Sequence, residues 1–142
     1  MSANLIAKSS ITISASATRV WDALTTPDLI KKYFYGSKTV TDWKVGSPIK
    51  FIGEWEGKTY EDKGIILKNE PEKLFQYTYL SSFSTLPDVP ENYANITYEL
   101  HEEDGQTTLN VKQENIEDEE KRQHSEKGWN DVLQNLKNLL EK

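Results

Sequence analysis

Cysteine is absent from this 142-residue sequence. Its absence excludes disulfide bridges and cysteine ligands to a metal, and it agrees with a reducing compartment. Long hydrophobic runs are absent too, since no segment approaches the roughly 20 apolar residues that cross a membrane as a helix. The N-terminal segment MSANLIAKSS lacks the apolar core of a signal peptide. We therefore expect a cytoplasmic protein without a membrane span.

Basic residues are too few and too scattered to form a nucleic-acid surface. The chain has 17 lysines and arginines against 23 aspartates and glutamates, and its net charge is −6 at pH 7. No basic cluster is interleaved with aromatic residues, as a surface that binds phosphates and bases would require. We therefore expect no nucleic-acid partner. The length predicts a single domain over residues 1–142.

The familiar catalytic and metal-binding motifs are also missing. HExxH, CxxC, GxSxG and glycine-rich phosphate loops do not occur. His101 and His124 lie in polar stretches, so we expect both on the surface, and the acidic segment 102–104 is better explained as a charged turn than as a metal site. We expect no cofactor and no enzymatic activity. Glu61 and Asp62 are neighbours on a predicted strand, so at most one of them points inward.

The C-terminal stretch 115–142 has the pattern of one long amphipathic helix. Its large apolar residues recur at steps of three and one, which places them on one helical face. Asn115 or Asp118 can serve as the N-cap. The first half of the stretch is almost entirely polar, so only the second half needs to dock fully. The apolar residues are Trp129, Val132, Leu133, Leu136, Leu139 and Leu140.

The rest of the chain predicts a sheet for this helix to cover. Residues 5–14 alternate as a strand, and 18–26 and 28–34 predict two short helices separated by Pro27. From 38 to 113 the period is two, with turns too short for parallel crossovers, which predicts about six antiparallel strands. The fold class is α+β, with a curved antiparallel sheet wrapped around the long helix and a cavity between them.

Two glycines inside predicted elements call for an explanation. Gly64 interrupts a strand, which indicates a bulge or a close approach of another backbone. Gly128 lies inside the long helix, where glycine costs about 1 kcal/mol relative to alanine. We expect a neighbouring element to approach its backbone closely, so that leucine at this position would destabilise the fold. The segment 81–92 is either a lid over the cavity or a plain connection.

Several short motifs in order resemble a known family. The segment V-W-D-A-L-T-T-P at 20–27 resembles the V-W-x-A-L-T-x-P signature of the SRPBCC (START/Bet v 1-like) superfamily. Gly128 and Trp129, followed by leucines at 133, 136 and 140, resemble the C-terminal helix of one branch. That branch is the activator of heat-shock protein 90 ATPase C-terminal-like family. The resemblance implies the helix-grip fold, in which a curved sheet grips a long C-terminal helix over a cavity.

The resemblance leaves three functions open, since the superfamily includes ligand binders, co-chaperones and cyclase-like enzymes. The favoured prediction is a protein that binds a small hydrophobic or aromatic ligand in the cavity. The first alternative is a chaperone-associated module, although co-chaperones of this type carry an extra N-terminal domain. The second is a small cyclase- or hydrolase-like enzyme, which would need a buried Asp, Glu or His facing the cavity. The oligomeric state is not predicted.

Aromatic residues are the best candidates for the ligand site. The chain has 7 tyrosines, 4 tryptophans and 4 phenylalanines, many of them on the predicted strands. Buried tyrosine hydroxyls need partners, and cavities with a few polar points are typical of small-molecule sites. The alternative is that the rings only fill the core, which we favour for Phe51 and Trp129 and leave open for the tyrosines. The predicted cavity-lining residues are Tyr33, Phe51, Trp55, Tyr77, Tyr79, Tyr98 and Trp129.

Overall fold

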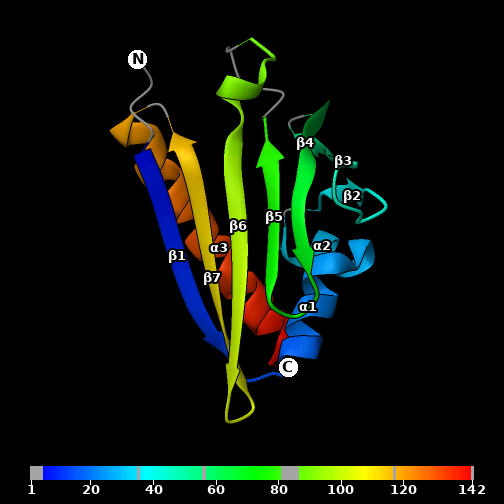
Figure 1. Cartoon of the computed structure of the whole chain (residues 1–142), viewed down its shortest axis with the longest axis vertical. Helices are drawn as coiled ribbons and strands as arrows, with labels where there is room; N and C mark the ends of the chain where they lie inside the picture. Colours follow the sequence, from blue (N-terminus) through cyan, green and yellow to red (C-terminus); the bar gives the residue numbers. More distant parts are fainter. Residues whose placement is uncertain (1–4, 35, 56, 81–86, 117, 142) are drawn as a thin grey trace.

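A seven-stranded antiparallel sheet and three α-helices make up the fold (Figure 1). The computed structural model describes residues 5–34, 36–55, 57–80, 87–116 and 118–141, and for Trp55 and Pro90 the backbone alone. The strands are β1 (Leu5–Ile13), β2 (Lys38–Val40), β3 (Pro48–Trp55), β4 (Lys58–Glu70), β5 (Leu74–Tyr79), β6 (Ala94–Glu103) and β7 (Gln106–Ile116). The helices are α1 (Ala17–Thr25), α2 (Pro27–Tyr33) and α3 (Glu119–Leu140), with a short 3-10 helix at Pro90–Asn92.

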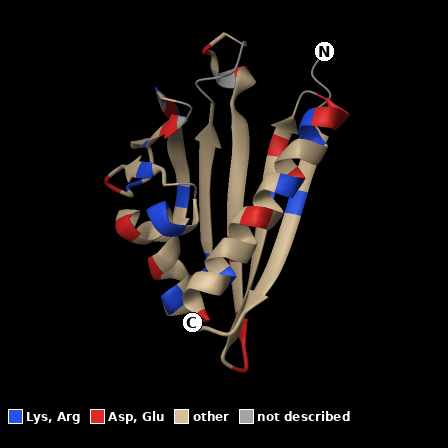
Figure 2. Ribbon diagram, turned by 180° about the vertical axis from the view of Figure 1, so that it is seen from behind, with Lys and Arg blue, Asp and Glu red and all other residues tan. Residues whose placement is uncertain are grey.

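The strands follow one another across the sheet in the order β1-β7-β6-β5-β4-β3-β2. Each neighbouring pair is antiparallel, as the short turns predicted. The β6–β7 hairpin turns at Asp104 and Gly105, both at positive φ, which suits the twist of the two strands. The helices lie on one side of the sheet, so the predicted α+β helix-grip fold is confirmed (Figures 1 and 2).

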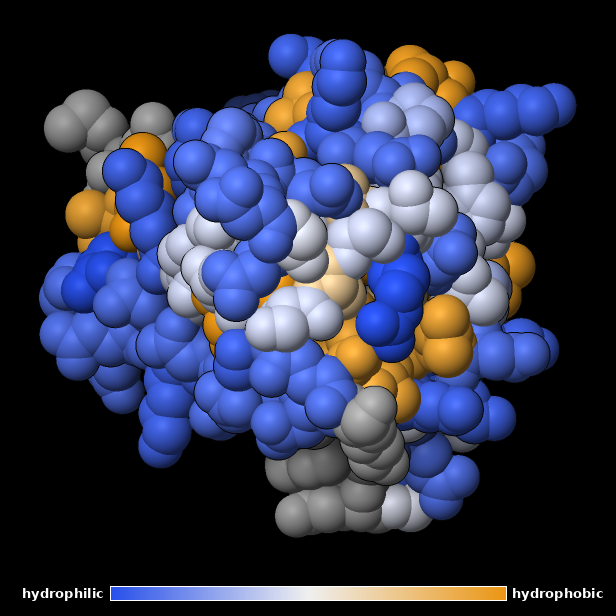
Figure 3. All heavy atoms as spheres, turned by 90° about the horizontal axis from the view of Figure 1, so that it is seen from below, coloured by the Kyte–Doolittle hydropathy of each residue, from blue (hydrophilic) through white to orange (hydrophobic). Residues whose placement is uncertain are grey.

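The two short helices close one end of the sheet. The Ser16 hydroxyl caps α1 by accepting a hydrogen bond from the Arg19 backbone N–H at 3.2 Å. Pro27 starts α2, where its missing N–H costs nothing because the first N–H groups of a helix have no partner within it. Seen from this end (Figure 3), the surface is mostly hydrophilic, with hydrophobic residues showing between the polar ones. The apolar faces of both helices are turned inward, since Val20 and Leu24 of α1 and Ile30 of α2 are buried in the core.

The long helix begins later than the pattern from Asn115 indicated. Asp118 is the N-cap, and its carboxylate accepts from the Lys121 N–H at 2.8 Å. Asn115 belongs instead to β7 at φ 66°, and its amide donates to the carbonyl oxygens of Glu91 and Tyr93. It therefore ties the end of β7 to the segment before β6 and has no part in the cap.

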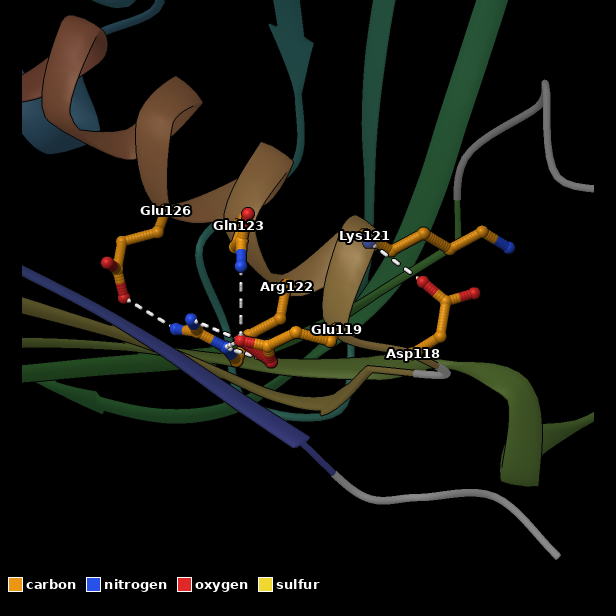
Figure 4. A network of polar contacts seen from close by, with 6 residues as sticks. All are labelled: Asp118, Glu119, Lys121, Arg122, Gln123 and Glu126. Atoms are coloured by element: carbon orange, nitrogen blue, oxygen red, sulfur yellow. Dashed lines mark hydrogen bonds and ion pairs between the residues drawn. The ribbon is translucent and has the colours of Figure 1, made fainter.

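Charged side chains support the first turns of α3, as Figures 2 and 4 show. Arg122 donates to Glu119 at 2.6–2.9 Å and to Glu126 at 3.0 Å, and Gln123 also approaches Glu119. These half-exposed pairs at i,i+3 and i,i+4 each contribute a few tenths of a kcal/mol. The first half of α3 is thus held mainly by its cap and its ion pairs.

The second half of α3 is held by packing. Its buried residues are Trp129, Val132, Leu133, Leu136 and Leu140. Polar contacts fix its position along β1, where Lys137 donates to the Thr12 carbonyl at 2.8 Å and Ser9 bonds to Asn130. Arg19 of α1 donates to the Leu140 carbonyl at 2.9 Å. The predicted division between a polar first half and a docked second half is therefore correct.

Some predicted boundaries differ from the structure. The strand expected from residue 38 ends at Val40, because the chain turns away and Trp43 takes φ 67°. Of the segment 81–92, residues 81–86 lie outside the described part of the chain, so the question of a lid stays open. In the described remainder, Asp88 accepts hydrogen bonds from Lys63 and Tyr93.

Candidate functional site

A pocket of about 760 Å³ lies between α3 and the inner face of the sheet. Its lining residues come from the end of the sheet away from α1, where β3, β5 and β7 end and β4 and β6 begin. Figure 1 shows β5 and β7 ending there, beside the first turns of α3. Its described lining comes from α3, from the segment after α2 and from five strands. The lining residues are Phe34, Ser37, Phe51, Glu54, Tyr60, Asp62, Tyr77, Tyr79, Ile96, Gln113, His124, Ser125, Gly128, Trp129 and Val132.

Aromatic rings in mutual contact form much of the wall. Phe51 of β3 contacts Tyr77 and Tyr79 of β5, with ring centroids 5.7 Å and 5.9 Å apart. Phe34 stacks on Phe51 at 6.3 Å and meets Trp129 of α3 edge-on at 5.9 Å. Such contacts stabilise the rings beyond their burial and fix their orientation. The wall is therefore preformed, with rings from β3, β5, α3 and the segment after α2.

One carboxylate is buried in this aromatic wall. Asp62 of β4 is 6% exposed and pairs directly with Phe51 in the β3–β4 ladder, so both side chains lie on the inner face. The Tyr79 hydroxyl donates a hydrogen bond to Asp62 Oδ2. Glu61, its neighbour, is exposed on the other face. The prediction that at most one of the two points inward is confirmed, and the inward one is Asp62.

The Tyr60 hydroxyl is a second polar group of the pocket, and its ring lies over Gly53 of β3. The Tyr60 hydroxyl and Ser37 Oγ are 2.8 Å apart. Gly53 is opposite Tyr60 in the ladder, and a Cβ at this glycine would lie 2.4 Å from the tyrosine oxygen. The glycine thus leaves room for the ring to cover the strand. Ser37 was not foreseen, because nothing in the sequence shows that the chain after α2 returns to this ring.

Two of the predicted residues lie behind the pocket, in the core. The Tyr33 hydroxyl donates to the Ala23 carbonyl at 2.8 Å, which joins α2 to α1. The Tyr98 hydroxyl is 3.0 Å from that of Tyr77, and its ring contacts Trp129 edge-on at 5.9 Å. Burial raises the pKa of Tyr33, Tyr77 and Tyr98 above the ordinary value of 10.0, so all three stay neutral at physiological pH.

The other predicted residues divide between the pocket wall and the undescribed part of the chain. The pocket brings together Phe51, Tyr77, Tyr79 and Trp129. The Trp55 side chain lies outside what the structure describes, so its place is not assigned. As ligand contacts, all of these residues remain predictions.

The helix side of the pocket carries little side-chain volume. The Trp129 indole N–H donates to Gln113 Oε1 at 2.8 Å, which turns the ring edge toward β7. One turn earlier, α3 presents Ser125 and His124, and then Gly128. These small or polar side chains do not fill the space above the sheet. The pocket exists partly because this helical face carries so little volume.

Gly128 is not the site of close packing that the sequence predicted. A Cβ built on Gly128 has no heavy atom within 4 Å, apart from the helix's own backbone and the chain neighbours. The prediction of a close approach is wrong here, and open pocket space takes its place. For Gly64 the same prediction is correct: a Cβ there would lie 1.6 Å from the Thr78 carbonyl oxygen. The register shift in the β4–β5 ladder falls two residues later, between Ile66 and Lys68.

Neither a metal-binding cluster nor a membrane-spanning helix occurs in the part of the chain that the structure describes. Within that part of the chain, no group of three or more His, Cys, Asp or Glu side chains is placed to hold a metal ion. None of the described helices is both long enough and apolar enough to cross a membrane.

Comparison with solved structures gives several close likenesses. ChR145 from Cytophaga hutchinsonii is 42% identical, with a TM-score of 0.85 over 99% of this chain and 97% of that one. The Aha1 dimer from Colwellia psychrerythraea is 24% identical, with a TM-score of 0.75 over 96% of each chain. An HSP90 activator from Plasmodium falciparum is 16% identical, with a TM-score of 0.76 over 96% of each chain. The last two likenesses establish the fold alone.

Comparison of the sequence itself assigns the family. Among curated protein sequences, none matches this chain. The model of a family described as activator of Hsp90 ATPase homolog 1-like protein matches residues 14–141, nearly the whole chain. This agrees with the resemblance carried by the 20–27 segment and by Gly128 and Trp129. The chain belongs to the activator of Hsp90 ATPase homolog 1-like family.

Proposed function

We propose that this protein binds a small molecule with an aromatic or apolar body in the pocket between α3 and strands β3–β7. The observation that carries the proposal is the wall of touching rings, Phe34, Phe51, Tyr77, Tyr79 and Trp129, around about 760 Å³ of space. Ligand pockets are commonly of this size and are lined by aromatic side chains with a few polar groups. A cytoplasmic location, as the sequence predicted, is part of the proposal.

The binding test uses a dye and a substitution that fills the pocket. N-phenylnaphthylamine is neutral and aromatic, and its fluorescence rises when it leaves water. Gly128→Phe adds a ring on the side of α3 that faces the pocket, where the backbone has open space. Lys127→Phe is the matched control, because it adds the same ring to the preceding, exposed position.

The expected result is saturable dye binding to the parent protein and to Lys127→Phe. Gly128→Phe should weaken binding at least tenfold while unfolding at the parent's temperature or above. Equal binding by both phenylalanine variants would place the dye elsewhere on the surface. No saturable binding by the parent would count against an apolar ligand in this pocket.

A second candidate function is association with a chaperone of the Hsp90 class. Membership of the activator of Hsp90 ATPase homolog 1-like family favours it. The measurement is the steady-state ATPase rate of Hsp90 with and without this chain. A rate that does not change at saturating protein would reject activation. Gly128→Phe separates the two functions, because it fills the pocket while leaving the outer surface of the fold intact.

We propose no enzymatic activity. A cyclase- or hydrolase-like enzyme would need a buried acid or base at the cavity, and Asp62 has that position. In our proposal its role is recognition. Product formation from an aromatic ligand by the parent would overturn the proposal that the protein is not an enzyme. If that turnover depends on Asp62, Asp62→Asn should abolish it.

A further inference from the structure

The pocket combines aromatic rings with negative charge. Its described lining includes two carboxylates, the buried Asp62 and the exposed Glu54, and no lysine or arginine. Among the described lining residues, His124 alone carries a nitrogen that can be protonated, and its side chain is exposed. The whole chain carries a net charge of −6. The potential inside such a pocket attracts cations and disfavours anions.

Asp62 lines the pocket, so a ligand there lies beside its carboxylate. It lies in mid-strand, opposite Phe51 and bonded to the Tyr79 hydroxyl, and those two rings are 5.9 Å apart. A carboxylate has two oxygens that can together accept several hydrogen bonds, so the tyrosine and a ligand donor can bind it at once. Removing a carboxylate from water is costly, and a cationic donor compensates that cost better than a neutral one.

The neighbouring rings add a second attraction for the same kind of group. Phe51 and Tyr79 belong to the wall that carries the carboxylate, and Phe34 stacks on Phe51 from the segment after α2. An ammonium group within about 6 Å of a ring face is attracted by the ring's quadrupole. A carboxylate framed by aromatic rings therefore recognises an amine cation by charge, by hydrogen bond and by cation–π contact.

We propose that the ligand carries a protonated amine on its aromatic or apolar body, and that the Asp62 carboxylate receives that amine. The proposal deepens the proposed function and rests on it, since the same pocket holds the body of the ligand. The amine donates an N–H to Asp62, and the apolar body extends toward Trp129 and Val132 of α3. Ligands of the same shape with a carboxylate in place of the amine are rejected.

The test compares three probes of one shape. Naphthylmethylamine, naphthylmethanol and naphthoate share an aromatic body and differ in the charge of the small group, which is positive, neutral or negative. Each is titrated against the parent by NMR chemical-shift mapping in about 0.15 M salt, which screens the general field of the protein. Asp62→Asn removes the charge and keeps an oxygen that accepts from Tyr79. Glu61→Gln removes the same charge from the exposed neighbour and is the matched control.

We expect the amine to bind the parent about tenfold more tightly than the alcohol, because a hydrogen bond between charged groups is worth at least that factor. Asp62→Asn should reduce this preference to less than about threefold, and an unchanged unfolding midpoint in urea shows that its fold is intact. Glu61→Gln should retain the full preference. Naphthoate should bind most weakly to the parent.

The possible failures are distinguishable. If amine and alcohol bind the parent equally, or if Asp62→Asn keeps the preference, the amine proposal is wrong. If the alcohol still binds the parent and Gly128→Phe abolishes that binding, the proposed function stands although the amine proposal has failed. If none of the three probes shifts the resonances of pocket residues, both proposals fail together.

Discussion

The inner face of one sheet is packed solid at one end and hollow at the other. At the β6–β7 hairpin end, Leu136 of α3 and Phe75 of β5 are almost fully buried in the core. At the opposite end, the same helix presents Gly128 and the same strand presents Tyr79, and about 760 Å³ remains between helix and sheet. The strands continue through both ends without interruption. The volume of the helical side chains therefore decides where the fold is core and where it is pocket.

The two ends are also stabilised by different forces. The packed end gains from burial of apolar surface, at about 25 cal/mol per Å². The first turns of α3 beside the pocket are held by the Asp118 cap and by the ion pairs of Arg122, which are half-exposed and individually weak. A binding site built at the less stable end can adjust to a ligand without disturbing the core.

Truncation of the packed end should have the largest effect. Leu136 is 0% exposed, so Leu136→Ala should lower the free energy of unfolding by about 2–5 kcal/mol. Urea denaturation followed by circular dichroism measures it. The same method applied to Ser125→Ala, on the pocket side of α3, should give a change below about 0.5 kcal/mol. Similar losses at both positions would remove the distinction between the two ends.

A methyl group at Gly64 should have the next largest effect. Its Cβ would overlap the Thr78 carbonyl oxygen of β5, and that oxygen cannot swing aside as a flexible side chain can. We expect Gly64→Ala to cost about 3 kcal/mol. The unfolding midpoint in urea measures the loss. An alanine variant as stable as the parent would show that β4 and β5 do not approach each other so closely.

The same methyl group at Gly128 should have the opposite sign. Alanine is favoured over glycine inside a helix by about 1 kcal/mol, and here the added carbon meets open space. Gly128→Ala should therefore raise the free energy of unfolding by up to about 1 kcal/mol. If Gly128→Ala melts at a lower temperature than the parent, a neighbouring element does approach the Gly128 backbone closely, as the sequence pattern indicated.

Alkaline pH should reveal the buried tyrosines through a loss of stability. Burial raises the pKa of Tyr33, Tyr77 and Tyr98 above 10.0, whereas the unfolded chain releases its tyrosine protons near that value. The folded state binds more protons there, so stability is complete below about pH 10 and falls as pH rises further. Urea unfolding at about pH 9 and about pH 11 measures the decline. Equal stability at both values would contradict the burial of these hydroxyls.

Much of the fold could be predicted from the sequence, because periodicity reports which face of an element is buried. The alternation in 5–14 and the three- and four-residue steps after Trp129 predicted β1 and the docked half of α3 correctly. The helix start was predicted less well, since Asn115 and Asp118 are both suitable caps and only tertiary contacts hold Asn115 in β7.

The site was harder to predict, because periodicity gives the face of a residue and not its depth. Tyr77 and Tyr98 both face inward on paired strands, yet Tyr77 lines the pocket and Tyr98 lies behind it. For Asp62, parity indicated an inward side chain, but only the strand pairing placed it beside Phe51. Gly128 has two possible explanations, close packing or open space, and the sequence does not distinguish them.

The most direct test of the central claim is to locate a bound apolar molecule on the protein. Intermolecular nuclear Overhauser effects between N-phenylnaphthylamine and assigned methyl groups give that location. We expect contacts to the methyls of Ile96 and Val132, which line the pocket. Contacts instead to Ile65 and Leu67, which are exposed on β4 away from the pocket lining, would contradict the claim that the hollow end of the sheet is the binding site.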